Sequence, residues 1–300
     1  MQKITPFLWF DNNAEEAINF YVDTFKDSKI LSIEKRPADL PEPEDIPNLP
    51  DLTGKVMQAE FSIMGQKFKA MDAGPYFKFT PAISFMVILK NEAEVEGLWQ
   101  KLSEGGEVLM PLDKYDFSSK YGWANDKYGV SWQVMFDPMR ESVQTSLLFV
   151  GDQAGKAEEA LNFYASTFPN SKVGEITNYP EGTPDAGTVM YGELNLAGRP
   201  FSLMDSSLEH KFDFNEAVSL YVDCKDQAEV DKYWQELTAN GGEESQCGWL
   251  KDKYGVSWQI VPRALIDMMN DPDRDKANRA IEAMLKMQKI DVAELKKAAE

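Results

Sequence analysis

The strongest constraint on the fold of this chain is that the sequence contains the same domain twice. Residues 15–21 read Glu-Glu-Ala-Ile-Asn-Phe-Tyr, and residues 158–164 read Glu-Glu-Ala-Leu-Asn-Phe-Tyr. Residues 126–133 read Asp-Lys-Tyr-Gly-Val-Ser-Trp-Gln and return unchanged at residues 252–259. A chain of 300 residues is long enough for two ordinary cores. We therefore divide it into a first domain (1–139), a second domain (144–262) and a C-terminal extension (263–300).

Hydrophobic patterns predict that each copy consists of two βαβββ modules, which gives an α+β fold class. Ala17, Ile18, Tyr21 and Phe25 recur at helical spacing, whereas apolar residues alternate in the flanking segments. For the first module we expect, in order, a strand at 4–10, a helix at 14–25 and strands at 30–33, 56–63 and 68–71, the last two forming a hairpin. For the second module we expect a strand at 83–89, a helix at 93–102 and strands near 108, 123 and 130–136.

The two copies differ in two longer segments of the first copy. Residues 37–50 are acidic and proline-rich, which predicts a loop that stays extended over the surface. Residues 109–121 are expected to form a second long loop, which the second copy nearly lacks between Gly242 and Gly248.

The C-terminal extension carries the signals of separate helices. Asp271-Pro272-Asp273 predicts a helix start, and an apolar stripe follows it: Ala277, Ala280, Ile281, Met284 and Leu285. Asp291 and Glu294 have the spacing of a capping box. We expect these helices to pack on the domains or on a second subunit, because the acidity of the chain disfavours lipid binding.

Charge and cysteine usage narrow the partners and the compartment. A net charge of −19, from 31 basic and 50 acidic residues, repels phosphate backbones and anionic lipid surfaces, so we expect neither nucleic acid nor membrane as a partner. The N-terminus has no signal-peptide pattern, and no apolar run is long enough to span a bilayer. Cys224 and Cys247 are too few for a disulfide framework. We expect a reduced, cytoplasmic protein with a second copy of itself as a possible partner.

Three motifs, present in both copies or at the N-terminus, carry a family resemblance. They are the Glu-Glu-Ala helix ending in Phe-Tyr, the segment Asp-Lys-Tyr-Gly-Val-Ser-Trp-Gln, and Thr5-Pro6-Phe7-Leu8. Together with the paired modules, they resemble the PhnB-like family of the vicinal oxygen chelate superfamily, which includes glyoxalases and bleomycin-resistance proteins. Members are often labelled 3-demethylubiquinone-9 3-methyltransferase. The resemblance covers residues 4–262 and implies that the paired modules form curved, open, mixed sheets.

The same resemblance predicts no metal and no cofactor for this chain. Metal-using members supply His and Glu ligands from four strands. The matching positions of the first copy are Thr5, a position near Ala70 or Met71, Ser84 and Gln133, and those of the second copy are Thr145, a position near Leu203 or Met204, Ser219 and Gln259. Such side chains bind divalent metals poorly. PhnB-like relatives often have a strand histidine where this chain has Gln58 and Tyr191. His210, the one histidine, is expected in a surface loop. No strand ends in a glycine-rich nucleotide turn, so the methyltransferase activity is not transferred.

A cleft with aromatic walls is the remaining candidate site. Strand alternation puts Gln58 and Glu60 on the concave face of their sheet. The same parity is expected to place Thr5, Phe7 and Trp9 beside Gln133, and Tyr121 and Trp123 are expected to complete the wall, together with Tyr115 and Phe117. The predicted ligand-binding residues are Thr5, Phe7, Trp9, Gln58, Tyr121, Trp123 and Gln133. Core packing is the alternative for the aromatic members, and for Trp132 and Phe136 we favour it.

Glu60 and its counterpart Glu193 are the repeated carboxylates of this face. Glu60 is the predicted catalytic residue, as a general base if burial raises its pKa. The alternative is a solvated strand glutamate.

The sequence thus favours a metal-independent protein that binds a small aromatic or apolar molecule, with the cleft in the first domain and the second domain serving mainly as its partner face. One alternative is an enzyme of unassigned reaction, a lyase, isomerase or transferase that uses Glu60 or a bound metal. Another is a scaffold whose cleft is filled by side chains.

Overall fold

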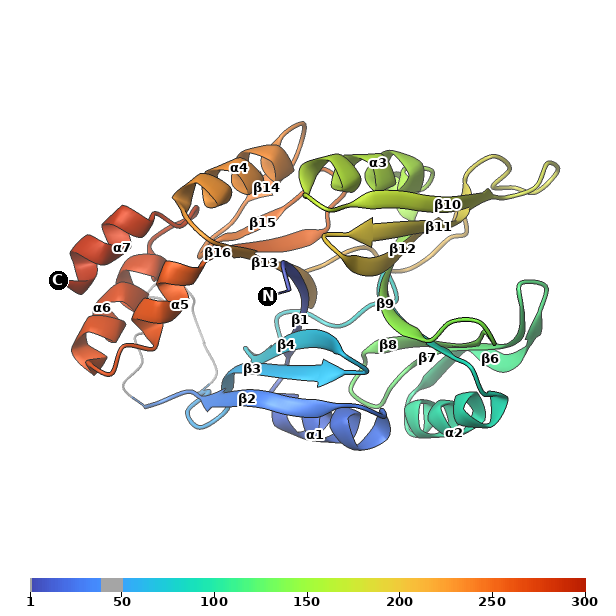
Figure 1. Ribbon diagram of the computed structural model, residues 1–300, viewed down its shortest axis with the longest axis horizontal. Coiled ribbons are helices and arrows are strands. Elements are labelled where there is room, and N and C mark those ends of the chain that lie inside the picture. The colour runs from blue at the N-terminus through green and yellow to red at the C-terminus, as the bar shows by residue number, and fades with distance from the viewer. Residues whose placement is uncertain (1, 39–50) are drawn as a thin grey trace.

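The computed structural model describes residues 2–38 and 51–300, which form two eight-stranded sheets with helices packed against them (Figure 1). The first copy contains β1 (Ile4–Phe10), α1 (Ala14–Thr24), β2 (Lys29–Lys35), β3 (Val56–Ile63), β4 (Gln66–Asp72), β5 (Ile83–Leu89), α2 (Glu92–Ser103), β6 (Glu107–Tyr115), β7 (Ser118–Asn125) and β8 (Ser131–Phe136). The second contains β9 (Ser142–Phe149), α3 (Ala157–Thr167), β10 (Lys172–Asn178), β11 (Val189–Leu196), β12 (Arg199–Asp205), β13 (Val218–Cys224), α4 (Gln227–Thr238), β14 (Glu243–Glu244), β15 (Trp249–Lys251) and β16 (Ser257–Pro262). The extension forms α5 (Arg263–Met269), α6 (Arg274–Leu285) and α7 (Val292–Ala299).

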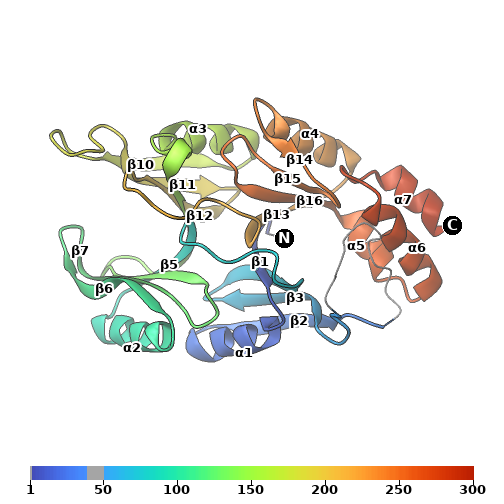
Figure 2. The same ribbon diagram turned by 180° about the vertical axis from the view of Figure 1, so that it is seen from behind.

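Each sheet combines one module from each copy. Sheet A has the strand order β14-β15-β16-β13-β1-β4-β3-β2, so the first module of the first copy joins the second module of the second copy. Sheet B has the order β10-β11-β12-β9-β5-β8-β7-β6 and joins the other two modules. The joins are antiparallel, through β1 with β13 in sheet A and β5 with β9 in sheet B. The two copies are therefore interlocked, as Figure 2 shows from behind.

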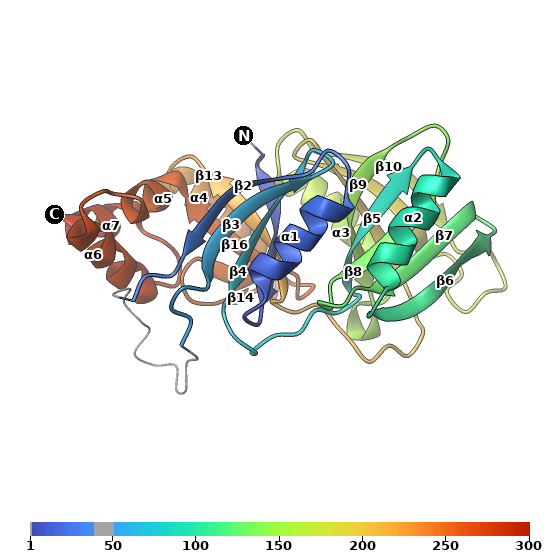
Figure 3. The same cartoon turned by 90° about the horizontal axis from the view of Figure 1, so that it is seen from below.

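The convex faces of the two sheets share one core. Phe68 of sheet A meets Phe85 of sheet B edge to face, with ring centroids 5.0 Å apart. Helices α1 and α2 lie side by side along this side of the molecule, each over the sheet of its own module (Figure 3). Both concave faces consequently point away from the shared core.

The repeated Asp-Lys-Tyr-Gly-Val-Ser-Trp segment has a structural role at this core. Asp126 Oδ2 accepts hydrogen bonds from Tyr21 Oη at 2.7 Å and Trp132 Nε1 at 2.8 Å, and Oδ1 accepts from two backbone N–H groups. Asp252 makes the same four contacts with its own copy's counterparts. Since Tyr21 belongs to a sheet A module and Trp132 to sheet B, the Asp126 carboxylate links the sheets.

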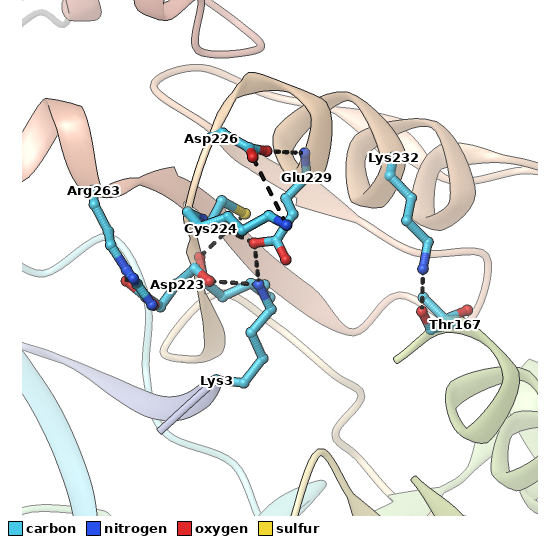
Figure 4. Close-up of polar contacts among 10 residues, drawn as sticks. Lys3, Thr167, Asp223, Cys224, Asp226, Glu229, Lys232 and Arg263 are labelled. Carbon is cyan, nitrogen blue, oxygen red and sulfur yellow. Dashed lines mark hydrogen bonds and ion pairs between the residues drawn. The ribbon is translucent and has the colours of Figure 1, made fainter. Parts of the chain in front are cut away.

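Lys3 fastens the join between β1 and β13 (Figure 4). Its Nζ donates to the Asp223 carbonyl oxygen at 2.6 Å and to Glu229 Oε2 at 2.7 Å. The same ammonium lies 4.8 Å from the centroid of the Tyr233 ring. The N-terminal strand of the first copy is thereby held to the last module of the second copy.

The element order and the open, mixed sheets confirm the predicted fold, with one local correction. Residues 109–121 are not a loop, because they form most of the hairpin between β6 and β7, with Tyr115 opposite Ser118. Of the predicted loop at 37–50, residues 39–50 lie outside the described residues. No helix among the described residues has the length and apolarity needed to cross a bilayer.

Helix α7 begins where the sequence predicts, whereas α6 is capped by Asp273 and not by Asp271 before Pro272, and α5 was not predicted. Asp273 caps α6 by accepting from the backbone N–H groups of residues 275 and 276, and Asp291 caps α7 in the same way. Leu265, Ile290 and Leu295 are buried in one cluster with Phe7 and Tyr221 of sheet A. The extension therefore packs on the concave face of sheet A, and no helix of the described residues covers sheet B in the same way.

Candidate functional site

A cavity of about 520 Å³ lies between the concave face of sheet A and helices α5 and α6. Its floor comes from both copies, with Phe7, Trp9 and Met71 from the first and Tyr221, Trp249 and Gln259 from the second. The roof is apolar: Leu265, Ile266, Met269, Ile281, Met284 and Leu285. The remaining lining residues are Arg36, Leu52, Met57, Gln58, Asp72, Ala73, Tyr76, Phe77, Cys247 and Val261.

The aromatic floor is held in place by its own ring contacts. Trp9 meets Phe77 and Trp249 edge to face, with ring centroids 5.0 and 5.9 Å apart. The Trp9 indole N–H donates to the Gly74 carbonyl oxygen at 2.9 Å. These rings are therefore fixed before any ligand arrives, which lowers the conformational entropy lost on binding.

Three polar side chains line the cavity without a full set of partners. Gln259 Nε2 donates to Ser219 Oγ at 2.9 Å, which leaves Gln259 Oε1 without a donor among the described residues. The Gln58 amide and the Tyr221 hydroxyl form no hydrogen bond with any described residue. Burial raises the pKa of Tyr221, so its hydroxyl stays protonated. Burial likewise raises the pKa of Cys247 to about 11, so this thiol is not an activated nucleophile.

A charged groove adjoins the cavity and shares Gln58, Tyr221 and Ile266 with it. In this groove Glu60 forms ion pairs with Lys67 and Lys69. Burial acts to raise the pKa of Glu60, but the two ammonium groups outweigh it and hold the pKa below its usual value. Arg263 forms a forked ion pair with Asp223, whose oxygens lie 2.9 and 3.1 Å from the Arg263 Nε (Figure 4).

The concave face of sheet B is filled by its own side chains. Tyr121, 5% exposed, packs with Met86, Ile88 and Met135. The Tyr121 hydroxyl donates to Gln133 Oε1 at 2.7 Å, and Gln133 Nε2 donates to Ser84 Oγ at 2.7 Å. Burial raises the pKa of Tyr121. The polar groups on this face are thus satisfied internally.

A second cluster of hydrogen-bonded polar side chains lies on the same sheet. Gln144 Nε2 donates to the Tyr191 hydroxyl at 2.9 Å, and Ser146 and Ser202 pair through their hydroxyls at 2.7 Å. Tyr191 is the counterpart of Gln58 in the repeat. At this strand position, Tyr191 is hydrogen-bonded within sheet B, whereas Gln58 lines the cavity of sheet A.

The structure separates the predicted ligand-binding residues into two groups. Phe7, Trp9 and Gln58 line the cavity of sheet A, and Thr5 lines the adjoining groove. Tyr121, Trp123 and Gln133 belong to sheet B, so the single cleft predicted from the sequence does not form. Strand parity indicates which face a side chain occupies, but not which sheet its strand joins.

The cavity residues that the sequence analysis missed come from both copies and from the extension, and the second copy supplies Tyr221, Cys247, Trp249, Gln259 and Val261. In sheet A, Thr5 lies opposite Tyr221, and Tyr221 lies beside Gln259. Gln259 therefore takes the place expected for Gln133. The repeat could have identified Trp249 and Gln259 as counterparts of Trp123 and Gln133, but nothing in the sequence places them against β1.

The described residues contain no group of three or more His, Cys, Asp or Glu side chains that could hold a metal ion. His210 lies in the loop between β12 and β13, as expected, and its Nε2 is 2.9 Å from Ser206 Oγ. Partial burial lowers the pKa of His210.

Comparison with known families gives one match that covers both copies. Residues 2–135 and 141–261 each match the family described as 3-demethylubiquinone-9 3-methyltransferase. The chain belongs to this family. The name of the family does not assign the methyltransferase reaction to this cavity, since the described residues include no glycine-rich nucleotide turn after a strand.

Some similar solved structures match about half of this chain, and others match most of it. A PhnB protein from Bacillus cereus, which carries the same methyltransferase description, is 43% identical over 45% of this chain and 100% of its own, with a TM-score of 0.40. Protein PA1353 from Pseudomonas aeruginosa is 28% identical over 44% of this chain and 94% of its own, with a TM-score of 0.36. Glyoxalase I from Zea mays is 12% identical over 86% of this chain and 90% of its own, with a TM-score of 0.54, which establishes the shared fold. Among curated proteins, none matches this sequence.

Proposed function

We propose that this PhnB-like protein binds an apolar, largely aromatic small molecule in the cavity of sheet A, without a metal ion. The observation that carries the proposal is the partly open space of about 520 Å³, lined mainly by aromatic rings, methionines and other apolar side chains. Small-molecule sites have this volume and composition. On the concave face of sheet B, which is built from equivalent strands, Tyr121 packs instead in a buried cluster with Met86, Ile88 and Met135.

The lining favours a flat ligand. Trp9, Trp249 and Phe7 offer ring faces and edges that are fixed in advance. Aromatic pairs contribute roughly 0.5–1.5 kcal/mol beyond the area that they bury. The methionines of floor and roof, Met57, Met71, Met269 and Met284, adapt to irregular apolar shapes.

A binding function is better supported than a catalytic function in which Glu60 acts as the general base. A general base near neutral pH needs a raised pKa, whereas Lys67 and Lys69 hold the pKa of Glu60 below its usual value. Glu60 also lies in the charged groove and not in the apolar cavity.

The test uses two equivalent tryptophans. Trp249 lines the cavity, and Trp123 occupies the matching position on sheet B, where its indole N–H donates to Ser131 Oγ at 2.8 Å. A panel of one- to three-ring aromatic compounds is titrated by calorimetry into wild type, Trp249→Ala and Trp123→Ala. We expect at least one compound of the panel to bind wild type with a Kd that is about tenfold higher for Trp249→Ala and unchanged for Trp123→Ala. Weakening by Trp123→Ala alone would refute the assignment of the cavity.

A further inference from the structure

We propose that the ligand of the cavity is a phenol, and that Gln259 Oε1 accepts the hydrogen bond of its hydroxyl. This inference rests on the proposed function and specifies the chemical class of the molecule bound. It comes from comparing the cavity with the face of sheet B, where the protein itself places a phenol.

The equivalence between the two faces is ungapped over the region that matters. Residues 121–125 read Tyr-Gly-Trp-Ala-Asn, and residues 247–251 read Cys-Gly-Trp-Leu-Lys, each directly before the identical repeated segment. Trp123 lies opposite Gln133 in sheet B, and Trp249 lies opposite Gln259 in sheet A. Cys247 is therefore the counterpart of Tyr121 in the sequence, although Tyr121 lies within β7 and Cys247 precedes β15 with φ 58°.

On sheet B, the Tyr121 side chain satisfies the glutamine. Its ring packs with Met86 and Met135, and its hydroxyl lies 2.7 Å from Gln133 Oε1. Ser84 Oγ accepts a hydrogen bond from Nε2 of the same glutamine, Gln133. A phenol is thus the group that this arrangement of glutamine and serine accommodates.

On sheet A, the serine is kept and the phenol is missing. Ser219 accepts from Gln259 Nε2 as Ser84 does from Gln133 Nε2. Cys247 is too short to reproduce the ring, and Gln259 Oε1 has no donor among the described residues. Gln259 is 6% exposed, so its carbonyl is open mainly toward the cavity. Gln259 Oε1 is not among the fully buried unpaired atoms of the described residues, so it is accessible, and an acceptor that lines a cavity favours a ligand that brings a donor.

The border between the cavity and the charged groove has polar groups as well. Gln58 and Tyr221 line both the cavity and the charged groove, and neither side chain hydrogen-bonds to a described residue. A ligand longer than one ring therefore meets further polar groups where the cavity adjoins the groove. The volume of about 520 Å³ leaves room for a fused-ring phenol.

The experiment compares 2-naphthol with 2-methoxynaphthalene, which keeps the rings but cannot donate a hydrogen bond. Kd values are measured by calorimetry for wild type, Gln259→Leu and the matched control Gln133→Leu on sheet B. We expect wild type and Gln133→Leu to bind 2-naphthol about tenfold more tightly than the ether. Gln259→Leu is expected to bind both probes equally. Gln259→Met, which keeps the length of the side chain, serves as a second variant if Gln259→Leu does not fold.

The outcomes separate the two proposals. Equal binding of both probes by wild type, or a preference that survives in Gln259→Leu and Gln259→Met, overturns the phenol inference and leaves the binding function standing. Failure of wild type to bind either of these probes or any compound of the aromatic panel overturns the proposed function and the inference together.

Discussion

Sheets A and B are built from equivalent strands, yet sheet A forms a cavity with helices α5 and α6, whereas on sheet B Tyr121 packs in a buried cluster. Two differences account for this contrast. Cys247 stands where sheet B has Tyr121, and helices α5 to α7 cover the concave face of sheet A alone. The comparison teaches that a repeated framework, fixed by Asp126 and Asp252, can carry one structural face and one binding face.

The largest effect is expected from opening the filled face with Tyr121→Cys, which gives sheet B the residue of sheet A. Tyr121 is 5% exposed and supplies the donor to Gln133, so its removal leaves both a void and an unpaired acceptor. We expect a loss of about 3 kcal/mol in the free energy of unfolding, measured by urea denaturation. A loss near zero would mean that the ring does not fill this face.

The reverse exchange, Cys247→Tyr, closes the cavity. The backbone at Cys247 has φ 58°, a strain that cysteine already bears, so an unbranched tyrosine adds mainly volume. We expect a ligand found with wild type to bind about 100-fold more weakly, measured by calorimetry. Cys247→Ser is the matched control and should bind like wild type. Unchanged affinity in a folded Cys247→Tyr protein would place the ligand elsewhere.

The cover of sheet A is tested with Leu265→Ala in α5. Leu265 is 3% exposed between the roof and the sheet, and sheet B has no counterpart for it. Truncation is expected to lower the free energy of unfolding by about 2 kcal/mol and to widen the cavity, so that bulkier ligands gain affinity. Met139→Ala, at a position that is 83% exposed, is the control and should leave both quantities unchanged.

The smallest effect concerns the charged groove and its pH dependence. Because Lys67 and Lys69 hold the pKa of Glu60 below its usual value of 4.5, the ion pairs stabilise the fold at neutral pH. This contribution is lost as the pH falls through the lowered pKa, when the carboxylate takes up a proton. Urea midpoints of wild type should therefore fall more steeply on acidification than those of Glu60→Gln. Parallel pH profiles of the two proteins would contradict this account.

Much of the fold could be predicted from the sequence because local patterns determine it. The alternation in β3 correctly placed Gln58 and Glu60 on the concave face. Asp291 located the start of α7, whereas α6 starts two residues after the predicted Pro272, with Asp273 as its cap. The candidate site was only half predicted, because Phe7 and Trp9 were placed on the correct face but beside residues of the wrong sheet.

The sequence by itself determined the two copies, the four modules and the inward or outward direction of most side chains, since these depend on short-range periodicity. Tertiary structure alone decided that β1 pairs with β13 and not with β5. Strand edges join through backbone hydrogen bonds that are the same for every residue, so the sequence does not mark which edges meet. The packing of the convex faces around the shared core selected the pairing, and this pairing set Phe7 and Trp9 against Tyr221 and Gln259.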